Sequence, residues 1–114
     1  MTHICHAHQC SVPVPPAMFM CKKHWYALRK PLRDAVWATY RPGQEVDKRP
    51  SMAYLAVQQW AIGELAFRPH DEEAARDAAP YLLTAQALRE RVIAEGGPDP
   101  LEGLVKKIPV DGEL

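Results

Sequence analysis

Residues 3–25, HICHAHQCSVPVPPAMFMCKKHW, contain all three cysteines and four of the five histidines of the chain. The cysteines and one histidine form two pairs, Cys5 with Cys10 and Cys21 with His24, and ten residues separate the pairs. Two ligand pairs on tight turns can converge on one tetrahedral ion, and thiolates with one imidazole suit zinc. The stretch therefore predicts one structural zinc ion, bound by Cys5, Cys10, Cys21 and His24.

The remaining histidines leave the choice of ligands open. Cys5 and His8 have CxxH spacing, so His8 could replace Cys10, and His6 also lies between the two cysteines. Thiolates compete better than imidazole for a closed zinc site, which favours Cys10. A weak second metal site that uses His3 with His6 and His8 is a further alternative. In another, the cysteines are simply small buried residues and bind no metal.

The order of the two pairs predicts the local fold. Residues 11–20 are apolar and contain Pro13, Pro15 and Pro16, which suits a short irregular hairpin better than a helix. A cysteine knuckle, a hairpin and a CxxH pair at a helix start form the layout of a treble clef finger. We therefore expect a mainly α fold with a short N-terminal β-hairpin, in which a treble-clef-like zinc finger leads into a small helical domain.

Prolines, glycines and caps divide the rest of the chain into helical segments. Ser51 is a plausible N-cap for an apolar helix that we expect near the centre of the core. Pro80 interrupts a later helical pattern, and we expect a break there, with Gly96 ending the last helix. The predicted helices are residues 22–30, 31–40, 52–67, 71–79 and 80–95.

Charge is balanced overall, with 14 basic and 14 acidic residues, but unevenly distributed. Residues 1–50 have a net charge of +5 and residues 51–114 a net charge of −5. We expect a zinc-binding helical domain at 1–67 and an acidic helical extension at 68–114 packed on it, with a loose tail at 108–114. No apolar run spans a membrane and no secretion signal opens the chain, so we expect the protein in the cytoplasm. An odd number of cysteines there argues against a disulfide framework.

A longer pattern covers about residues 5 to 62. It combines CxxxxC, a Pro-rich gap, CxxHW, KPLRDAVWATYRPGQE and PSMAYLAVQQW. The residues that carry it are Cys5, Cys10, Pro15, Pro16, Cys21, His24, Trp25, Pro31, Leu32, Arg33, Trp37, Tyr40, Arg41, Pro42, Gly43, Gln44, Pro50, Ser51, Tyr54 and Trp60. In these residues the chain resembles small, mostly uncharacterised proteins encoded by phages and prophages. The resemblance implies a phage accessory protein with a zinc-stabilised fold, working inside a bacterial host cell, and implies no activity.

The sequence favours binding over catalysis. Four good ligands would fill a tetrahedral zinc ion, and no HxE or HExxH pattern is present. Residues 11–20 contain no His, Asp or Glu, which argues against a nuclease of the HNH kind. We therefore expect no enzyme activity.

Two binding functions remain. The first is an inhibitor of a host or antiviral-defence protein complex, as anti-CRISPR proteins are. The second is a zinc-finger module that regulates by binding nucleic acid. Its contacts, which could equally meet a protein partner, would be the basic residues Lys22, Lys23, Arg29, Lys30, Arg33 and Arg41. We expect Trp25, Trp37 and Trp60 to anchor the core rather than to stack on bases.

Overall fold

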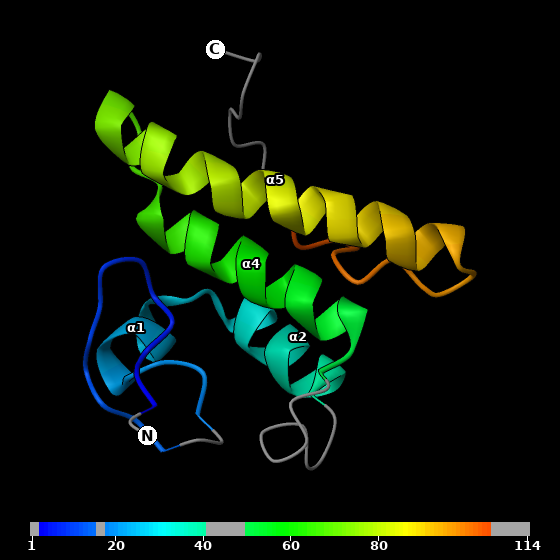
Figure 1. The fold of residues 1–114 in the computed structure, drawn as a ribbon, viewed down its shortest axis with the longest axis horizontal. Helices are drawn as coiled ribbons and strands as arrows, with labels where there is room; N and C mark the ends of the chain where they lie inside the picture. The colour runs from blue at the N-terminus through cyan, green and yellow to red at the C-terminus, as the bar shows by residue number, and fades with distance from the viewer. Residues whose placement is uncertain (1–2, 16–17, 41–49, 106–114) are drawn as a thin grey trace.

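The computed structural model describes residues 3–15, 18–40 and 50–105, and it has four α-helices in these ranges. They are α1 (Lys22–Ala27), α2 (Lys30–Thr39), α4 (Met52–Ala66) and α5 (Glu72–Ala94). Helices α4 and α5 lie side by side and antiparallel, and α2 packs on α4 from the other side (Figure 1). The N-terminal segment and α1 lie beside the α2–α4 pair (Figure 1). None of the helices described is long and apolar enough to cross a membrane.

Helix α4 is the central element, as the sequence predicts. Ser51 caps it, because the Ser51 hydroxyl oxygen accepts a hydrogen bond from the Tyr54 amide at 3.0 Å. The helix is apolar on several sides and buries, among others, Val57, Trp60 and Ala61. This distribution follows from its position, since α2 covers one side and α5 the other.

A glycine sets the close approach of α4 and α5. A Cβ atom added at Gly63 would lie 2.6 Å from Leu82 Cδ2 and 3.2 Å from the Leu82 backbone nitrogen. Real Cβ atoms essentially never show the first of these distances, so a larger residue at this crossing would require Leu82 to shift. Leu82 is fully buried there, together with Ala78 and Ala85 of the same helix.

The chain is mainly helical, but the predicted N-terminal β-hairpin is wrong. The described residues form no β-strand, and Ile4 and Pro13 make a single isolated antiparallel bridge. Proline has no backbone N–H, so Pro13 and Pro15 cannot donate the bonds that would extend this bridge into a ladder. Because a treble clef requires a hairpin at this place, the treble-clef-like assignment is wrong for the same reason.

The predicted break at Pro80 is also wrong, because α5 continues through this residue. Proline at this position removes one backbone hydrogen bond, the one that would reach the Arg76 carbonyl. Buried residues on both sides, Ala78 and Leu82, pack against α4 and offset this loss. The predicted stop is confirmed: α5 ends at Ala94, and Gly96 follows with a φ of 88°.

The proposed division at residue 68 falls in the turn between α4 and α5. Residues 72–94 pack along α4 as one long helix, and Leu101 beyond them is fully buried. Whether the two parts are separate domains stays a prediction. The predicted loose tail, residues 108–114, lies outside the described residues.

Candidate metal centre

The four predicted ligands, Cys5, Cys10, Cys21 and His24, lie together. Their ligand atoms are all within 4.8 Å of one another. His24 Nδ1 is 3.3 Å from Cys21 Sγ and 3.6 Å from Cys5 Sγ. Around tetrahedral zinc, with bond lengths of about 2.3 Å to sulfur and about 2.0 Å to nitrogen, these two atom types are roughly 3.6 Å apart. The cluster is therefore compatible with a metal ion site.

Local backbone structure positions each pair of ligands. In the first pair, the Cys10 amide donates to the Ala7 carbonyl at 3.1 Å, which closes a tight turn. Gln9 takes a left-handed conformation in this turn, with a φ of 61°. In the second pair, Cys21 is the N-cap of α1 and His24 lies one turn into the helix. Residues 5–10 are called the knuckle below.

Backbone amides stabilise negative charge on the sulfur atoms. The His24 amide bonds to Cys21 and lowers the pKa of the Cys21 thiol. Burial raises the pKa of the Cys5 thiol, although the Ala7 amide, 3.5 Å from Cys5 Sγ, opposes this. A metal ion binds thiolates. A cation in the cluster would therefore neutralise the negative charge that these amides stabilise only in part.

The three remaining N-terminal histidines have other partners. His3 Nε2 donates to the Met18 carbonyl at 2.9 Å, and His6 Nδ1 donates to the Phe19 carbonyl at 3.0 Å. His8 shares a 3.0 Å hydrogen bond with the Tyr81 hydroxyl. The alternative in which His8 replaces Cys10 is therefore not favoured. The described residues contain no second group of three or more metal-ligating side chains.

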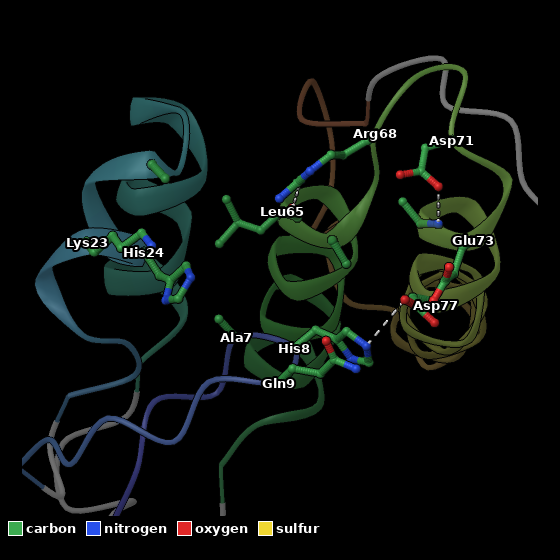
Figure 2. A pocket seen from close by; sticks show the side chains of 13 residues that line it. Ala7, His8, Gln9, Lys23, His24, Leu65, Arg68, Asp71, Glu73 and Asp77 are labelled. Carbon is green, nitrogen blue, oxygen red and sulfur yellow. Dashed lines mark hydrogen bonds and ion pairs between the residues drawn. The ribbon is translucent and has the colours of Figure 1, made fainter.

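His8 joins the knuckle to α5, a link that the sequence analysis missed. Besides the bond to Tyr81, His8 Nε2 lies 3.7 Å from an Asp77 carboxylate oxygen (Figure 2). Tyr81 and Asp77 are one turn apart on α5, so both meet the same imidazole. Nothing in the local spacing around His8 signals a partner 73 residues away.

A pocket of about 500 Å³ lies between the knuckle, α1, the end of α4 and the start of α5 (Figure 2). His24 borders it, so one side of the ligand cluster adjoins this pocket. Its lining carries both signs of charge, from Lys23, Arg68, Asp71, Glu73 and Asp77. Asp71 is already the N-cap of α5, where its carboxylate accepts from the Ala74 amide.

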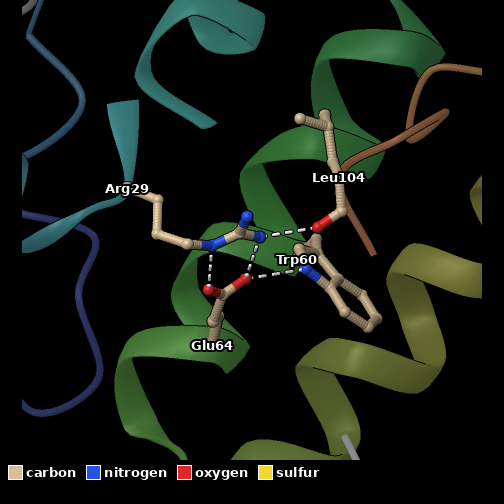
Figure 3. A network of polar contacts seen from close by, with 4 residues as sticks. All are labelled: Arg29, Trp60, Glu64 and Leu104. Carbon is tan, nitrogen blue, oxygen red and sulfur yellow. Dashed lines mark hydrogen bonds and ion pairs between the residues drawn. The ribbon is translucent and has the colours of Figure 1, made fainter. Parts of the chain in front are cut away.

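Arg29, a predicted contact residue, is instead part of an internal ion pair (Figure 3). Its Nε and Nη2 donate to the two Glu64 carboxylate oxygens at 2.6 and 2.9 Å, and Nη2 also donates to the Leu104 carbonyl. The indole Nε1 of Trp60 donates to the same carboxylate at 3.0 Å. These bonds to Glu64 raise the pKa of Arg29. In the sequence, Glu64 is the one acidic residue of the apolar α4, and this could have indicated that it pairs with a basic residue such as Arg29.

The other predicted contact residues differ in how exposed their charges are. Lys22 and Lys23 are exposed and make no ion pair with any described residue. Lys30 pairs with Asp34 at 2.8 Å in an exposed position. The guanidinium carbon of Arg33 lies 5.4 Å from the centre of the Tyr26 ring. Arg41 lies outside the described residues.

The tryptophans have different environments. Trp60 is 1% exposed and anchors the core as predicted, and Trp25 is half-buried against it. The prediction is wrong for Trp37, which is 62% exposed. Helix α2 buries the face of Leu32 and Val36, and Trp37 follows Val36 by one position, a rotation of about 100° away from the core.

Comparisons with known proteins leave the function to be argued from this geometry. The sequence matches no family model and no curated protein, and no solved structure matches the chain. The resemblance to phage and prophage proteins stays a prediction.

Proposed function

We propose that the chain is a small phage accessory protein that acts by binding, with one structural zinc ion at Cys5, Cys10, Cys21 and His24. Three thiolates and one imidazole are soft donors, which favour zinc over magnesium or calcium. The short helix α1 contains no buried residue, and the N-terminal part reaches the core through residues that flank this helix, Phe19, Met20 and Leu28. A bound ion would add stability to this part.

One observation carries the preference for binding over catalysis. Four ligand side chains converge, while His3, His6 and His8 are engaged elsewhere. A tetrahedral zinc ion with four protein ligands has no open position for water or substrate. A catalytic zinc ion needs such a position. This arrangement supports a structural role for the ion and a function that is carried out by the protein surface.

Elemental analysis of the purified full chain tests the zinc proposal. We expect about one zinc ion per chain, and its loss in Cys21→Ser, because the serine hydroxyl is a poor replacement for a thiolate. His70→Asn is the matched control: His70 is exposed, lies outside the cluster and has a left-handed φ of 62°, which asparagine tolerates. A folded parent without zinc, or a Cys21→Ser variant with full zinc content, would contradict the proposal.

The partner that we propose first is a protein complex of the host cell or of an antiviral defence system. Its support is charge: residues 71–95 contain six acidic and three basic residues, and the acidic Glu72 and Glu73 are exposed. Helix α5 lies on the opposite side of α4 from α2, the helix that carries Lys30 and Arg33 (Figure 1). Such a surface complements a basic protein surface.

Affinity capture from a nuclease-treated host lysate tests this partner. We expect the parent to retain a specific protein, and the double variant Glu72→Gln/Glu73→Gln to lose it. Glu102→Gln, an exposed acidic residue beyond α5, is the control that should retain it. If the parent retains no protein, or the double variant captures as well as the control, this partner proposal fails.

A further inference from the structure

We infer that α1 and α2 together present a binding surface for single-stranded nucleic acid. The surface, called the aromatic–basic face, consists of Lys22, Tyr26, Lys30, Arg33 and Trp37. The inference rests on the proposed binding function and adds a partner class and a location opposite α5. It keeps only part of the basic set expected from the sequence and adds two aromatic residues.

Helical spacing and contacts place these residues on one continuous surface. Lys22 and Tyr26 are one turn apart on α1, and Lys30, Arg33 and Trp37 follow one another at one-turn spacing on α2. Contact between Arg33 and Tyr26 bridges the two helices. The face is therefore not a set of scattered exposed residues.

Both aromatic rings are open to solvent. Tyr26 is 66% exposed and Trp37 is 62% exposed, the two highest values among the large exposed hydrophobic residues of the described ranges. Trp37 makes edge contacts with Trp25 at 6.2 Å and with Tyr40 at 5.8 Å, measured between ring centres. These contacts hold the indole in place, so ordering it for a ligand costs little.

The cations of this face are available to an anion. Arg33 makes no hydrogen bond or ion pair within the described part of the chain, and its Nε is buried without a partner. Lys22 is exposed and unpaired within the same ranges, and Lys30 has only an exposed partner, Asp34. A ligand cannot reach the buried Nε, but the terminal Nη atoms of Arg33 are not among the buried unpaired atoms, and they suit contacts with phosphate oxygens.

Exposed rings beside cations favour single strands over duplexes. Base faces are accessible for stacking in a single strand and are hidden in a duplex, whereas phosphates are accessible in both. Tyr, Trp and Arg are also common in protein interfaces, so an acidic protein surface is the alternative occupant that the test must exclude. Rings interleaved with cations at one-turn spacing match a single strand, in which bases and phosphates alternate.

Fluorescence anisotropy with the full-length, zinc-loaded protein tests the inference. The probes are a labelled mixed-sequence 12-mer as single-stranded DNA, the same sequence as single-stranded RNA, and the DNA duplex. We expect either single strand to bind more tightly than the duplex, and the DNA and RNA arms to tell which is preferred. With three cations engaged, the logarithm of the affinity should fall with the logarithm of salt concentration with a slope of about −2.

Matched variants locate the site. Trp37→Ala should weaken binding about tenfold or more through lost stacking, and Leu83→Ala, an exposed apolar residue on α5, should not. Arg33→Gln should weaken binding and reduce the salt slope by about 0.7, and Arg76→Gln, an exposed arginine on α5, should do neither. Thermal melting of each variant verifies that it is folded.

Several results would overturn the inference. They are no binding of either single strand at low salt, equal or tighter binding of the duplex, or binding that Trp37→Ala and Arg33→Gln leave unchanged. Loss of a nuclease-resistant protein partner in these two variants would assign the face to protein instead. A zinc-loaded, folded chain that fails to bind nucleic acid refutes this inference alone. A chain without zinc refutes the proposed function.

Discussion

The N-terminal part, residues 3–28, and the α4–α5 pair are held together by different means. Helix α1 has six residues and buries none of them, and the segment before it has one isolated bridge. Helices α4 and α5 have 15 and 23 residues, begin at capping side chains, and enclose Trp60 and Leu82. The N-terminal part does bury Phe19, Met20 and Leu28 in the core, but because its regular structure is sparse we expect convergent ligands to supply much of its remaining stability.

Metal removal should produce the largest effect and should act on one region only. With a strong chelator, we expect amides of residues 5–25 to lose their protection from hydrogen exchange, while those of α4 and α5 keep theirs. A structural zinc ion contributes on the order of 10 kcal/mol to the folding of small domains. Residue-resolved hydrogen exchange is the measurement. Uniform loss of protection in both regions would show that they are not energetically distinct.

Glu64→Gln should have the next largest effect, because it breaks the link between α4 and Arg29, the residue that follows the N-terminal part. The variant leaves the half-buried Arg29 without its counter-charge, and we expect a loss of about 2 kcal/mol in the free energy of unfolding. Asp34→Asn removes the exposed pair with Lys30 and is the control, with an expected loss of under about 0.5 kcal/mol. Urea unfolding measures both, and equal losses would contradict an internal role for Glu64.

Gly63→Ala should affect only the α4–α5 pair. The added methyl group meets Leu82, and we expect a loss of about 1–3 kcal/mol through separation of α4 and α5. Zinc content should be unchanged, because the cluster does not include either helix. Leu83→Ala, at the exposed neighbour of Leu82, should cost less. Thermal unfolding checks the order of the two variants, and the reverse order would contradict the close crossing.

The smallest of these effects should come from acid, which weakens the ion pair between Arg89 and Asp99 at the turn after α5. Arg89 donates two hydrogen bonds to Asp99, at 2.9 and 2.7 Å, and they lower the pKa of Asp99 below its ordinary 3.8. A depressed folded-state pKa contributes stability above the unfolded-state pKa, and this is lost as pH falls through the folded value. Asp99→Asn should therefore destabilise the chain by about 1 kcal/mol at pH 7 and by less near pH 2. An equal effect of Asp99→Asn at both pH values would rule out this origin.

Local signals were enough to predict the ligand cluster and the ends of several helices. The spacing of three cysteines and His24 identified four residues whose ligand atoms lie within 4.8 Å of one another. Ser51 was identified as a cap from its neighbours alone. Such features depend on a few adjacent residues, and tertiary contacts do not alter them. That the bound ion is zinc is part of the proposed function.

The errors arose where distant contacts decide the structure. Pro80 would break an isolated helix, but burial of Leu82 against Gly63 keeps α5 continuous. Trp37 lies next to an apolar face in sequence, and only the packing of α2 on α4 shows that it points away. The partners of Arg29 and His8 lie 35 and 73 residues away, beyond the reach of any spacing rule.

The bond from Arg29 to the Leu104 carbonyl joins positions 75 residues apart. The bond holds a segment close to the last described residue against the start of α2. Truncated versions intended for spectroscopy or crystallisation should therefore retain residues through at least 104, since a cut before that point would free Arg29 on one side.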